Sequence, residues 1–306
     1  MSTKQNDSLF SEMIKNCKNR FHKYNNSCPQ GKEFACGKCL ESIHYPRRLN
    51  GDPNRTYDCI PMADYYVCKY APKYTSEIVH TLKKVESIIN KQTINVLSFG
   101  CGPCTDLLAL EYMKKTNMLH YDKLEYMGID CNKEIWQTMH NEIKKYRSNC
   151  LSVNFCYEDI INMVDNLSQR SWNPNLIFFQ YVLSDMHKHS TPLLTTTFIN
   201  NFSKYFNEKL EPNSLVILND INLNNSNDGG RDYFDLLVKN IKSFKQYKYH
   251  FYNENSSYPG GGYGYGALEF NNSIMFDMAD YYNTEEEKMF TPFNKCSSAV
   301  LIIKKE

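Results

Sequence analysis

No stretch of the 306-residue chain is long and apolar enough to span a lipid bilayer. The first residues, 1–7, are polar and lack the apolar core of a signal peptide. The chain also lacks an excess of either charge, because its formal net charge is +1. We therefore expect a cytoplasmic protein without a membrane partner, and the overall charge gives no case for a large nucleic-acid surface.

Hydrophobic residues make up 42% of the chain and charged residues 23%, which is typical of a globular protein. A chain of 306 residues can bury a sizeable core and form one large domain with an accessory module. Composition carries no signal for the oligomeric state, which stays open.

Cysteine, by contrast, is abundant, with 12 residues in the chain. In the reducing compartment that we expect, thiols and metal ligands are favoured over disulfides. Several cysteines fall within residues 1–71, a region rich in proline, glycine and asparagine. Its hydrophobic periodicity is poor, apart from a short helix expected over residues 10–16. Such a region has little core of its own, so we predict a Cys-rich, loop-rich accessory module held by a staple.

Cys36 and Cys39 are the best candidates for that staple, because two thiolates on one turn can bind the same metal ion. A further thiol pair would complete a zinc site or an iron–sulfur cluster, and all-thiolate ligation suits either. The predicted ligands are Cys28, Cys36, Cys39, Cys59 and Cys68. Further candidates are Cys17, His22 and His44. Isolated buried thiols and disulfides are the alternatives.

Tyrosines and lysines are interleaved over residues 59–74, just before the regular part of the chain. The tyrosines are Tyr65, Tyr66, Tyr70 and Tyr74. They form either a cover over a bound ligand or a packing surface between the accessory module and the main domain.

From residue 75 onward the chain alternates between apolar strand patterns and helical patterns. The expected strands are 94–99, 124–129, 151–156, 176–183, 214–218, 247–252 and 297–304. The expected helices are 75–89, 105–115, 132–146, a short one from 159, 192–207 and 231–243. This alternation predicts an α/β domain over residues 72–306, with a mostly parallel sheet covered on both faces. The last two strands have no helix between them and can pair antiparallel.

A glycine-rich turn follows the first strand and opens the next helix. It reads Ser98-Phe99-Gly100-Cys101-Gly102-Pro103-Cys104. Gly100 and Gly102 allow a sharp bend and a close approach to a ligand, and the helix N-terminus offers free N–H groups. No third glycine stands at the spacing of a pyrophosphate-binding turn, which disfavours a nicotinamide cofactor.

Acidic and polar residues mark the ends of the next three strands in order. They are Asp130 after the second strand, Glu158 and Asp159 after the third, and Gln180 and Tyr181 at the fourth. With the glycine-rich turn, this arrangement resembles the class I S-adenosylmethionine-dependent methyltransferases over residues 72–306. The resemblance implies a Rossmann-like, seven-stranded sheet and S-adenosylmethionine as cofactor. Ser98 stands where the family commonly has an acid, and Cys104 where it commonly has a third glycine.

The resemblance also implies roles for single residues. Asp130 would accept hydrogen bonds from the ribose hydroxyls, Asp159 or Glu158 would bind the adenine amino group, and Ile160 would pack against the ring. The implied cofactor-binding residues are Ser98, Gly100, Gly102, Asp106, Asp130, Asp159, Ile160, Gln180 and Tyr181. Each acid taken alone can equally be a helix N-cap.

Methyl transfer needs in-line positioning and, for a protonated acceptor, a base. Asp185 and His187, with His189 nearby, follow the fourth strand and are the predicted catalytic residues. The alternative is a polar loop that opens the next helix. A glycine- and tyrosine-rich segment at 257–266 is a candidate substrate lid.

The sequence therefore predicts an enzyme that transfers a methyl group to an unidentified acceptor, which is an RNA, a protein or a small molecule. The Asn/Asp-Pro-Pro-Tyr sequence of many exocyclic-amine methyltransferases is absent, which argues against common forms of DNA base methylation. The alternative is a non-catalytic methyltransferase-fold module that binds cofactor or RNA and docks through its metal-stapled N-terminal segment.

Overall fold

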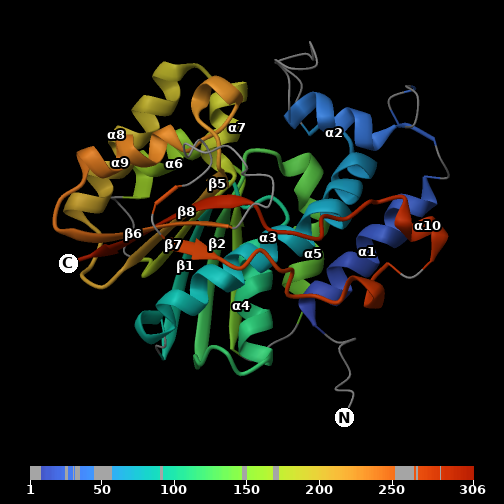
Figure 1. Ribbon diagram of the computed structural model, residues 1–306, viewed down its shortest axis with the longest axis horizontal. Coiled ribbons are helices and arrows are strands. Elements are labelled where there is room, and N and C mark those ends of the chain that lie inside the picture. The colour runs from blue at the N-terminus through green and yellow to red at the C-terminus, as the bar shows by residue number, and fades with distance from the viewer. Residues whose placement is uncertain are drawn as a thin grey trace.

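The computed structural model describes most of the chain, namely residues 8–24, 27–29, 31, 35–44, 57–89, 92–146, 150–167, 172–251, 265–266, 268–282 and 284–306. An eight-stranded sheet lies at its centre, with helices on both faces (Figure 1). The strands are β1 (Thr93–Phe99), β2 (Lys123–Ile129), β3 (Leu151–Cys156), β4 (Leu176–Gln180), β5 (Leu215–Ile221), β6 (Phe244–Phe251), β7 (Leu268–Phe270) and β8 (Ser298–Lys305).

The helices occupy the connections between the strands and the N-terminal region. They are α1 (Leu9–Lys23), α2 (Cys36–His44), α3 (Ile60–Ile89), α4 (Thr105–Lys115), α5 (Lys133–Lys145), α6 (Ile160–Leu167), α7 (Val182–His189), α8 (Pro192–Glu208), α9 (Asp232–Asn240) and α10 (Glu285–Lys288). Among the helices of the described residues, none combines the length and the apolar composition that a membrane span requires.

The strand order of the sheet is β3-β2-β1-β4-β5-β8-β6-β7. Strands β1 to β5 are parallel, and β8 pairs antiparallel with both β5 and β6. The sequence predicts the pairing of β6 with β8, whereas the pairing of β5 with β8 was not predicted. The short strand β7 pairs with β6 and adds an eighth strand to the seven that we expected. Because β1 lies between β2 and β4, the strand order reverses there and leaves a crevice at the carboxyl ends of the strands.

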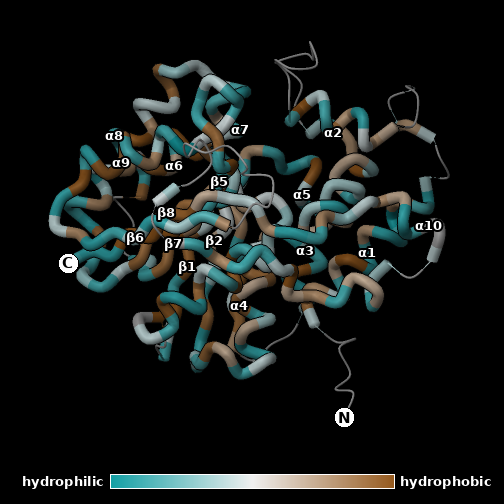
Figure 2. Tube along the Cα trace, in the orientation of Figure 1, coloured by the Kyte–Doolittle hydropathy of each residue, from teal (hydrophilic) through white to brown (hydrophobic). Residues whose placement is uncertain are grey.

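The two faces of the sheet bury separate apolar clusters. Val96 and Phe178 face α3, α4 and α5, whereas their chain neighbours Leu97 and Phe179 face α6, α8 and α9. Successive side chains of a strand point to opposite faces, so continuous apolar runs are needed where both faces are covered. Figure 2 shows hydrophobic stretches running through the sheet and the helix segments that face it.

Helix α3 differs most from its predicted extent. It runs unbroken over Ile60–Ile89, although the sequence predicts a helix only from residue 75 and a domain boundary at residue 71. Pro72 lies inside the helix and donates no hydrogen bond, while its carbonyl oxygen accepts one from Ser76 Oγ at 2.6 Å. The helix continues through the proline because the stretch around it, from Met62 to Val79, is almost entirely buried. The division into two domains stays a prediction.

Helix α1 packs on α3 and is longer than the expected 10–16. Its N-cap is Ser8, whose side chain accepts a hydrogen bond from the Ser11 N–H at 3.1 Å. Near its other end, Arg20 forms ion pairs with Asp64 of α3 at 2.7 Å and Glu142 of α5 at 2.5 Å. The N-terminal region is thus joined to the helices that cover the sheet (Figure 1).

Candidate functional site

A cavity of about 500 Å³ opens at the carboxyl ends of the parallel strands. Residues from the ends of five adjacent strands, β3, β2, β1, β4 and β5, line it, together with side chains from α2, α3 and α7. All of the cofactor-binding residues predicted from sequence contribute to its wall: Ser98, Gly100, Gly102, Asp106, Asp130, Asp159, Ile160, Gln180 and Tyr181. A cavity of this size, with an apolar wall and a few polar groups, is typical of a small-molecule site.

The turn after β1 has a backbone shape that favours glycine. Gly100 has a φ of +57° and Gly102 a φ of +42°, both in the left-handed region. A Cβ atom on Gly100 would lie 2.8 Å from Val182 Cγ2 at the start of α7, so the turn packs tightly against that helix. The Cys101 N–H donates to the Ile129 carbonyl oxygen at 2.9 Å and holds the turn against β2.

Asp130 directly follows β2 and supports this turn. Its Oδ2 accepts a hydrogen bond from the Gly102 N–H, and its Oδ1 accepts one from the Asn132 N–H, each at 2.9 Å. Burial raises the pKa of Asp130 above its ordinary value, while these two N–H groups act in the opposite direction. Each carboxylate oxygen keeps a further lone pair, so Asp130 can still accept hydrogen bonds from ligand hydroxyls.

Asp106 lies buried in the first turn of α4. Its Oδ1 accepts hydrogen bonds from Tyr126 Oη and from the Leu107 N–H, both at 2.9 Å. Its Oδ2 is buried without a hydrogen bond of normal geometry within the described residues. Burial raises the pKa of this carboxyl, whereas the nearby Ser98 hydroxyl acts in the opposite direction and lowers it. An unsatisfied carboxylate oxygen in a cavity wall is unfavourable, and a cationic or N–H-bearing ligand group would satisfy it.

Asp159 and Ile160 meet the cavity at the end of β3. Asp159 is exposed, and its Oδ1 accepts a hydrogen bond from the Ile161 N–H at 2.8 Å, so it caps the short helix α6. The cap that the sequence left open as an alternative is therefore present, and the same residue also lines the cavity.

Gln180 and Tyr181 connect the end of β4 to α3. The Gln180 Nε2 donates to the Tyr74 carbonyl oxygen at 2.8 Å. Tyr181 has a φ of +59°, which ends the strand, and its ring stacks on Tyr74 with centroids 4.0 Å apart. Its Oη donates to Glu77 Oε2 at 2.8 Å and accepts from Lys73 Nζ at 2.9 Å. This wall of the cavity is therefore fixed by contacts with α3.

The predicted catalytic residues fall into two groups on α7. Asp185 and His189 line the cavity, and His189 Nε2 lies 3.8 Å from Asp185 Oδ1. His187 is not part of the described cavity wall. Its Nδ1 lies 2.9 Å from Tyr233 Oη and its Nε2 lies 2.8 Å from the Asn225 carbonyl oxygen, so both ring nitrogens have partners away from the cavity.

An aromatic wall formed by Tyr57, Tyr66, Tyr70 and Tyr74 faces the cavity on the side of α3, and we call it the tyrosine wall. His44 of α2 joins it, since its ring nitrogens each lie 2.9 Å from a tyrosine hydroxyl, Tyr70 at Nδ1 and Tyr57 at Nε2. Of the four tyrosines singled out in the sequence, Tyr66, Tyr70 and Tyr74 line the cavity, whereas Tyr65 packs against Phe21 and Phe290. Tyr57 and Trp136 were not predicted from the sequence. Tyr66, Tyr70 and Tyr74 are spaced four residues apart, which is a helical signal.

Four of the five predicted metal ligands lie near one another. Burial raises the pKa of Cys36 to about 12, and the neighbouring thiols of Cys59, Cys39 and Cys28 contribute to the rise. The pair Cys36 and Cys39 lies in the first turn of helix α2 and not in an isolated turn. Within the described chain, no three of the five predicted ligands have sulfur atoms within 4.8 Å of one another. A metal site in this region stays a prediction.

Cys68 is set apart from the other predicted ligands. It is fully buried in α3, and burial raises its pKa well above the ordinary value, with the nearby Asp64 adding to the effect. Its thiol neighbour is Cys17 of α1. Cys68 therefore belongs to the packing between α1 and α3. The predicted lid at 257–266 lies outside the described residues, apart from Tyr265 and Gly266.

No protein-family model matches the chain, and no curated protein matches it. Among solved structures, the chain is similar to the plantazolicin methyltransferase BpumL in complex with a pentazolic desmethylPZN analogue and SAH, at 13% identity over 96% of this chain and 99% of that chain, with a TM-score of 0.47. It is also similar to a SAM-dependent methyltransferase from Archaeoglobus fulgidus, at 11% identity over 76% of this chain and 94% of that chain, with a TM-score of 0.40. A third similar structure is the magnesium protoporphyrin IX methyltransferase ChlM from Synechocystis PCC 6803 with bound SAH, at 12% identity over 95% of this chain and 100% of that chain, with a TM-score of 0.38. The mostly parallel sheet of this chain, with helices on both faces (Figure 1), has the Rossmann-like α/β architecture that the sequence predicts.

Proposed function

We propose that the chain is a methyltransferase that uses S-adenosylmethionine and transfers its methyl group to an acceptor still to be identified. The observation that carries the proposal is the hydrogen bond between Asp130 Oδ2 and the Gly102 N–H at one wall of the cavity. This hydrogen bond fixes a carboxylate beside the glycine-rich turn, at the point where the strand order of the sheet reverses. There the carboxylate can bind the ribose hydroxyls of a ligand that has no pyrophosphate.

The charges around the cavity suit a cationic cofactor. Asp106, Asp130 and Asp185 all line it, and Asp106 has a buried oxygen without a hydrogen bond of normal geometry within the described residues. Bound S-adenosylmethionine would supply an activated methyl group on a sulfonium and a free ammonium group. Asp106 would bind that ammonium, Asp130 the ribose hydroxyls, and Asp159 with Ile160 the adenine.

The remaining residues of the cavity would serve the acceptor. The tyrosine wall offers flat rings and hydroxyl groups, and these fit an acceptor with a planar group. Asp185 and His189 lie together at the cavity and would take up the proton that an oxygen or nitrogen acceptor loses. His187 would keep the last turn of α7 joined to α9 through Tyr233, which is a positioning role.

Calorimetric titration of the purified protein with S-adenosylmethionine, SAH and NAD tests the proposal. We expect binding of the first two and no binding of NAD. In the variant Asp130→Asn the dissociation constant for SAH should rise at least about tenfold, because charged hydrogen bonds are lost. The control Asp122→Asn changes an exposed carboxylate outside the cavity wall and should leave the affinity unchanged.

The outcomes separate the proposal from its alternatives. A protein that binds neither S-adenosylmethionine nor SAH overturns the proposal, and one that binds NAD is a nicotinamide-dependent protein. Incubation with S-adenosylmethionine labelled in its methyl group, together with RNA, protein and small-molecule fractions, tests turnover. Binding without transfer to any fraction identifies a non-catalytic module.

A further inference from the structure

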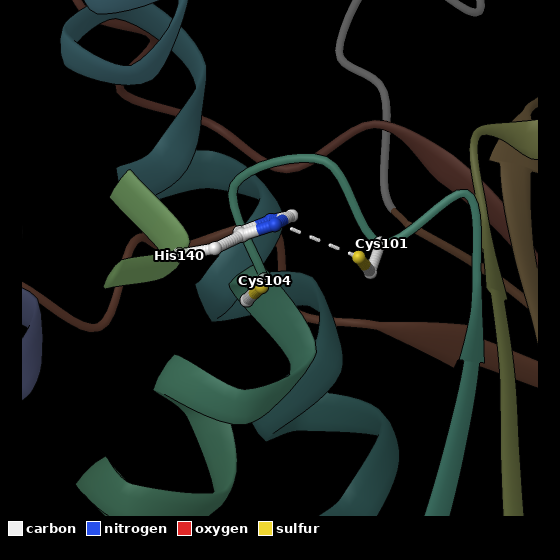
Figure 3. A group of neighbouring side chains, drawn as sticks. All are labelled: Cys101, Cys104 and His140. Atoms are coloured by element: carbon white, nitrogen blue, oxygen red, sulfur yellow. Dashed lines mark hydrogen bonds between the residues drawn. The ribbon is translucent and has the colours of Figure 1, made fainter. Parts of the chain in front are cut away.

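The glycine-rich turn contains a buried cluster that the proposed function does not use. Cys101 and Cys104 flank Gly102 and Pro103, and their sulfur atoms lie within 4.8 Å of each other and of a ring nitrogen of His140 on α5. Figure 3 shows the Cys101 sulfur beyond the nitrogen end of the imidazole ring and the Cys104 sulfur below the ring, and the Cys101 Sγ lies 3.9 Å from His140 Nε2. Cys104 and His140 are fully buried, and Cys101 lies in the cavity wall.

The hydrogen bonds of His140 disfavour a metal ion at this cluster. His140 Nε2 lies 2.7 Å from the Gly102 carbonyl oxygen, which can only accept, so this nitrogen carries the proton. Its Nδ1 lies 3.0 Å from Tyr157 Oη, and the ring stacks on Phe155 with centroids 3.8 Å apart. The nitrogen nearest to the sulfur atoms therefore has no lone pair for a metal, and the ring is held in that orientation.

The two thiols are placed so that they can form a disulfide. The Cys104 N–H donates to the Cys101 carbonyl oxygen at 2.6 Å, which closes a four-residue turn. The Cα atoms at the two ends of such a turn lie less than about 7 Å apart, and disulfides need a separation of about 4.4 to 6.8 Å. The sulfur atoms have to move less than about 3 Å closer to reach bonding distance.

The surroundings of the pair also favour its reaction. Burial by itself would raise the pKa of the Cys104 thiol, but hydrogen bonding with Cys101 and the nearby His140 ring outweigh burial and lower this pKa to about 7. Cys104 is also the N-cap of α4, where the helix dipole favours a negative charge. A small oxidant that enters the cavity reaches Cys101 first, because Cys101 lines the wall and Cys104 does not.

Closing the disulfide would change the turn that the cofactor needs. A Cβ atom on Gly128 of β2 would lie 2.8 Å from Cys101 Sγ, so this sulfur fills the place of a missing side chain on β2. Moving it toward Cys104 withdraws it from β2 and pulls on Gly102, whose N–H binds Asp130. Oxidation therefore acts on the same hydrogen bond on which the proposed function depends.

We propose that Cys101 and Cys104 form a reversible disulfide on exposure to hydrogen peroxide. We also propose that this disulfide weakens cofactor binding and that bound cofactor slows formation of the disulfide. The cofactor part of this inference rests on the proposed function, whereas the disulfide does not. The Cys104 thiol first loses its proton to water, and the Cys104 thiolate then takes the proton of Cys101. The Cys101 thiolate breaks the O–O bond of hydrogen peroxide to give a sulfenic acid and hydroxide, and this hydroxide takes the proton from Cys104 and becomes water. The Cys104 thiolate then attacks the sulfenic sulfur and releases a second hydroxide, which the first proton converts to water, so two thiols are oxidised and one peroxide is reduced.

The disulfide is tested on the full-length protein by peroxide treatment, alkylation of the remaining thiols and mass spectrometry of the peptides. We expect one peptide with Cys101 linked to Cys104, which dithiothreitol converts back to two free thiols. Cys104→Ser should give no such link. The control Cys131→Ser removes another thiol of the cavity wall and should form the link as the wild type does.

Calorimetry with SAH tests whether the disulfide weakens cofactor binding. The oxidised wild type and the oxidised Cys131→Ser variant should bind SAH about tenfold more weakly than their reduced forms, and dithiothreitol should restore the affinity. Saturating SAH should slow formation of the link, because coupling between two sites is reciprocal.

Each result has a distinct meaning. A reduced wild type that does not bind SAH overturns the proposed function and leaves the mass-spectrometric test standing. Binding by the reduced protein without a Cys101–Cys104 link after peroxide overturns the disulfide. A Cys101–Cys104 link that leaves the SAH affinity unchanged overturns the proposed effect of the disulfide on cofactor binding. Stoichiometric zinc bound by Cys101 and Cys104 would overturn the disulfide and make the cluster a metal site.

Discussion

Gly100 is a residue of the candidate site at which the backbone leaves no room for a side chain. Its φ of +57° is strained for any residue with a Cβ, and that atom would also lie 2.8 Å from Val182 Cγ2. Val182 begins α7, so a side chain at position 100 would push apart the turn and the helix that carries Asp185. A change at this one position therefore acts on both the cofactor half and the acceptor half of the cavity.

The variant Gly100→Ala should bind SAH at least about tenfold more weakly and lose more than the roughly 1–2 kcal/mol of unfolding free energy that left-handed backbone alone costs. Calorimetry and urea denaturation measure the two effects. Gly31→Ala is the matched control, because Gly31 has a φ of +67° but no atom within 4 Å of an added Cβ. Equal losses of stability in the two variants, with SAH affinity kept, would contradict the tight packing inferred at Gly100.

For single residues, the sequence predicts those positions that are marked by their immediate neighbours in the chain. Gly100, Gly102 and Asp130 follow strands directly, and all three lie where the chain order places them. His187 and His189 are only two positions apart, so their different environments cannot be read from the sequence. Long-range partners, namely Tyr233 and the Asn225 carbonyl oxygen, decide which of them is turned away from the cavity.

Helix α2 contributes Ile43 and the partly buried His44 to the cavity wall. His44 binds Tyr70 and Tyr57 through its two ring nitrogens. Burial lowers its pKa from 6.5 to about 3, and the nearby charges of Lys188 and His189 add to this effect. His44 is therefore neutral in the folded protein at pH values at which it would be protonated in the unfolded chain.

This difference predicts how pH affects the contribution of His44 to stability. The contribution is fully present above about pH 6.5 and is lost as the pH falls from there toward 3, because the unfolded chain then binds more protons. The loss should approach about 1.4 kcal/mol per pH unit over this range. Urea denaturation at pH 6.5, 5.5 and 4.5 should show that His44→Asn lacks this component of the pH dependence.

The control for this experiment is His120→Asn, which changes an exposed histidine and should keep the wild-type pH dependence. Other groups titrate in the same range, so the comparison rests on the difference between each variant and the wild type. A His44→Asn variant whose unfolding free energy follows the wild type in parallel from pH 6.5 to 4.5 would show that His44 is not held neutral.

Among the secondary-structure elements, α3 shows best what local patterns miss. A proline inside a helix costs about 3 kcal/mol, so Pro72 favours a boundary in any prediction from sequence. The burial of Tyr66, Tyr70 and Tyr74 on the continuing helix offsets that cost, and it becomes visible only once the cavity and α1 are in place. The strands of the sheet were easier to predict, because β-branched and aromatic runs between turns mark them locally.

For the whole molecule, the sequence predicts an N-terminal accessory module, and the structure packs α1 of this region into the same apolar cluster as the main core. Phe10 of α1 stacks on Phe276 from the far end of the chain, with ring centroids 3.9 Å apart. The same apolar cluster contains residues of α1, α3, α4 and β1. Contacts between residues more than 250 positions apart have no local signal, which is why composition alone favours two domains.

The last prediction follows from the size of this shared core. Helix α1 buries six apolar side chains, Leu9, Phe10, Met13, Ile14, Cys17 and Phe21. At about 1.5–3 kcal/mol for a large apolar side chain, their burial is comparable to the whole stability of a typical domain, about 5–15 kcal/mol. A chain that begins at Tyr57 should therefore show no cooperative unfolding transition in urea. A chain that begins at Ser8 keeps all of α1 and should unfold as the full chain does.

If the chain that begins at Tyr57 aggregates, single substitutions in α1 still test whether this helix stabilises the shared core. Phe10→Ala should lower the unfolding free energy by about 3–5 kcal/mol, because a fully buried ring is lost from a packed stack. Glu12→Ala, at an exposed position of the same helix, should change it by less than about 0.5 kcal/mol. A small effect of Phe10→Ala, together with a cooperative transition in the chain that begins at Tyr57, would mean that the N-terminal region is an independent module.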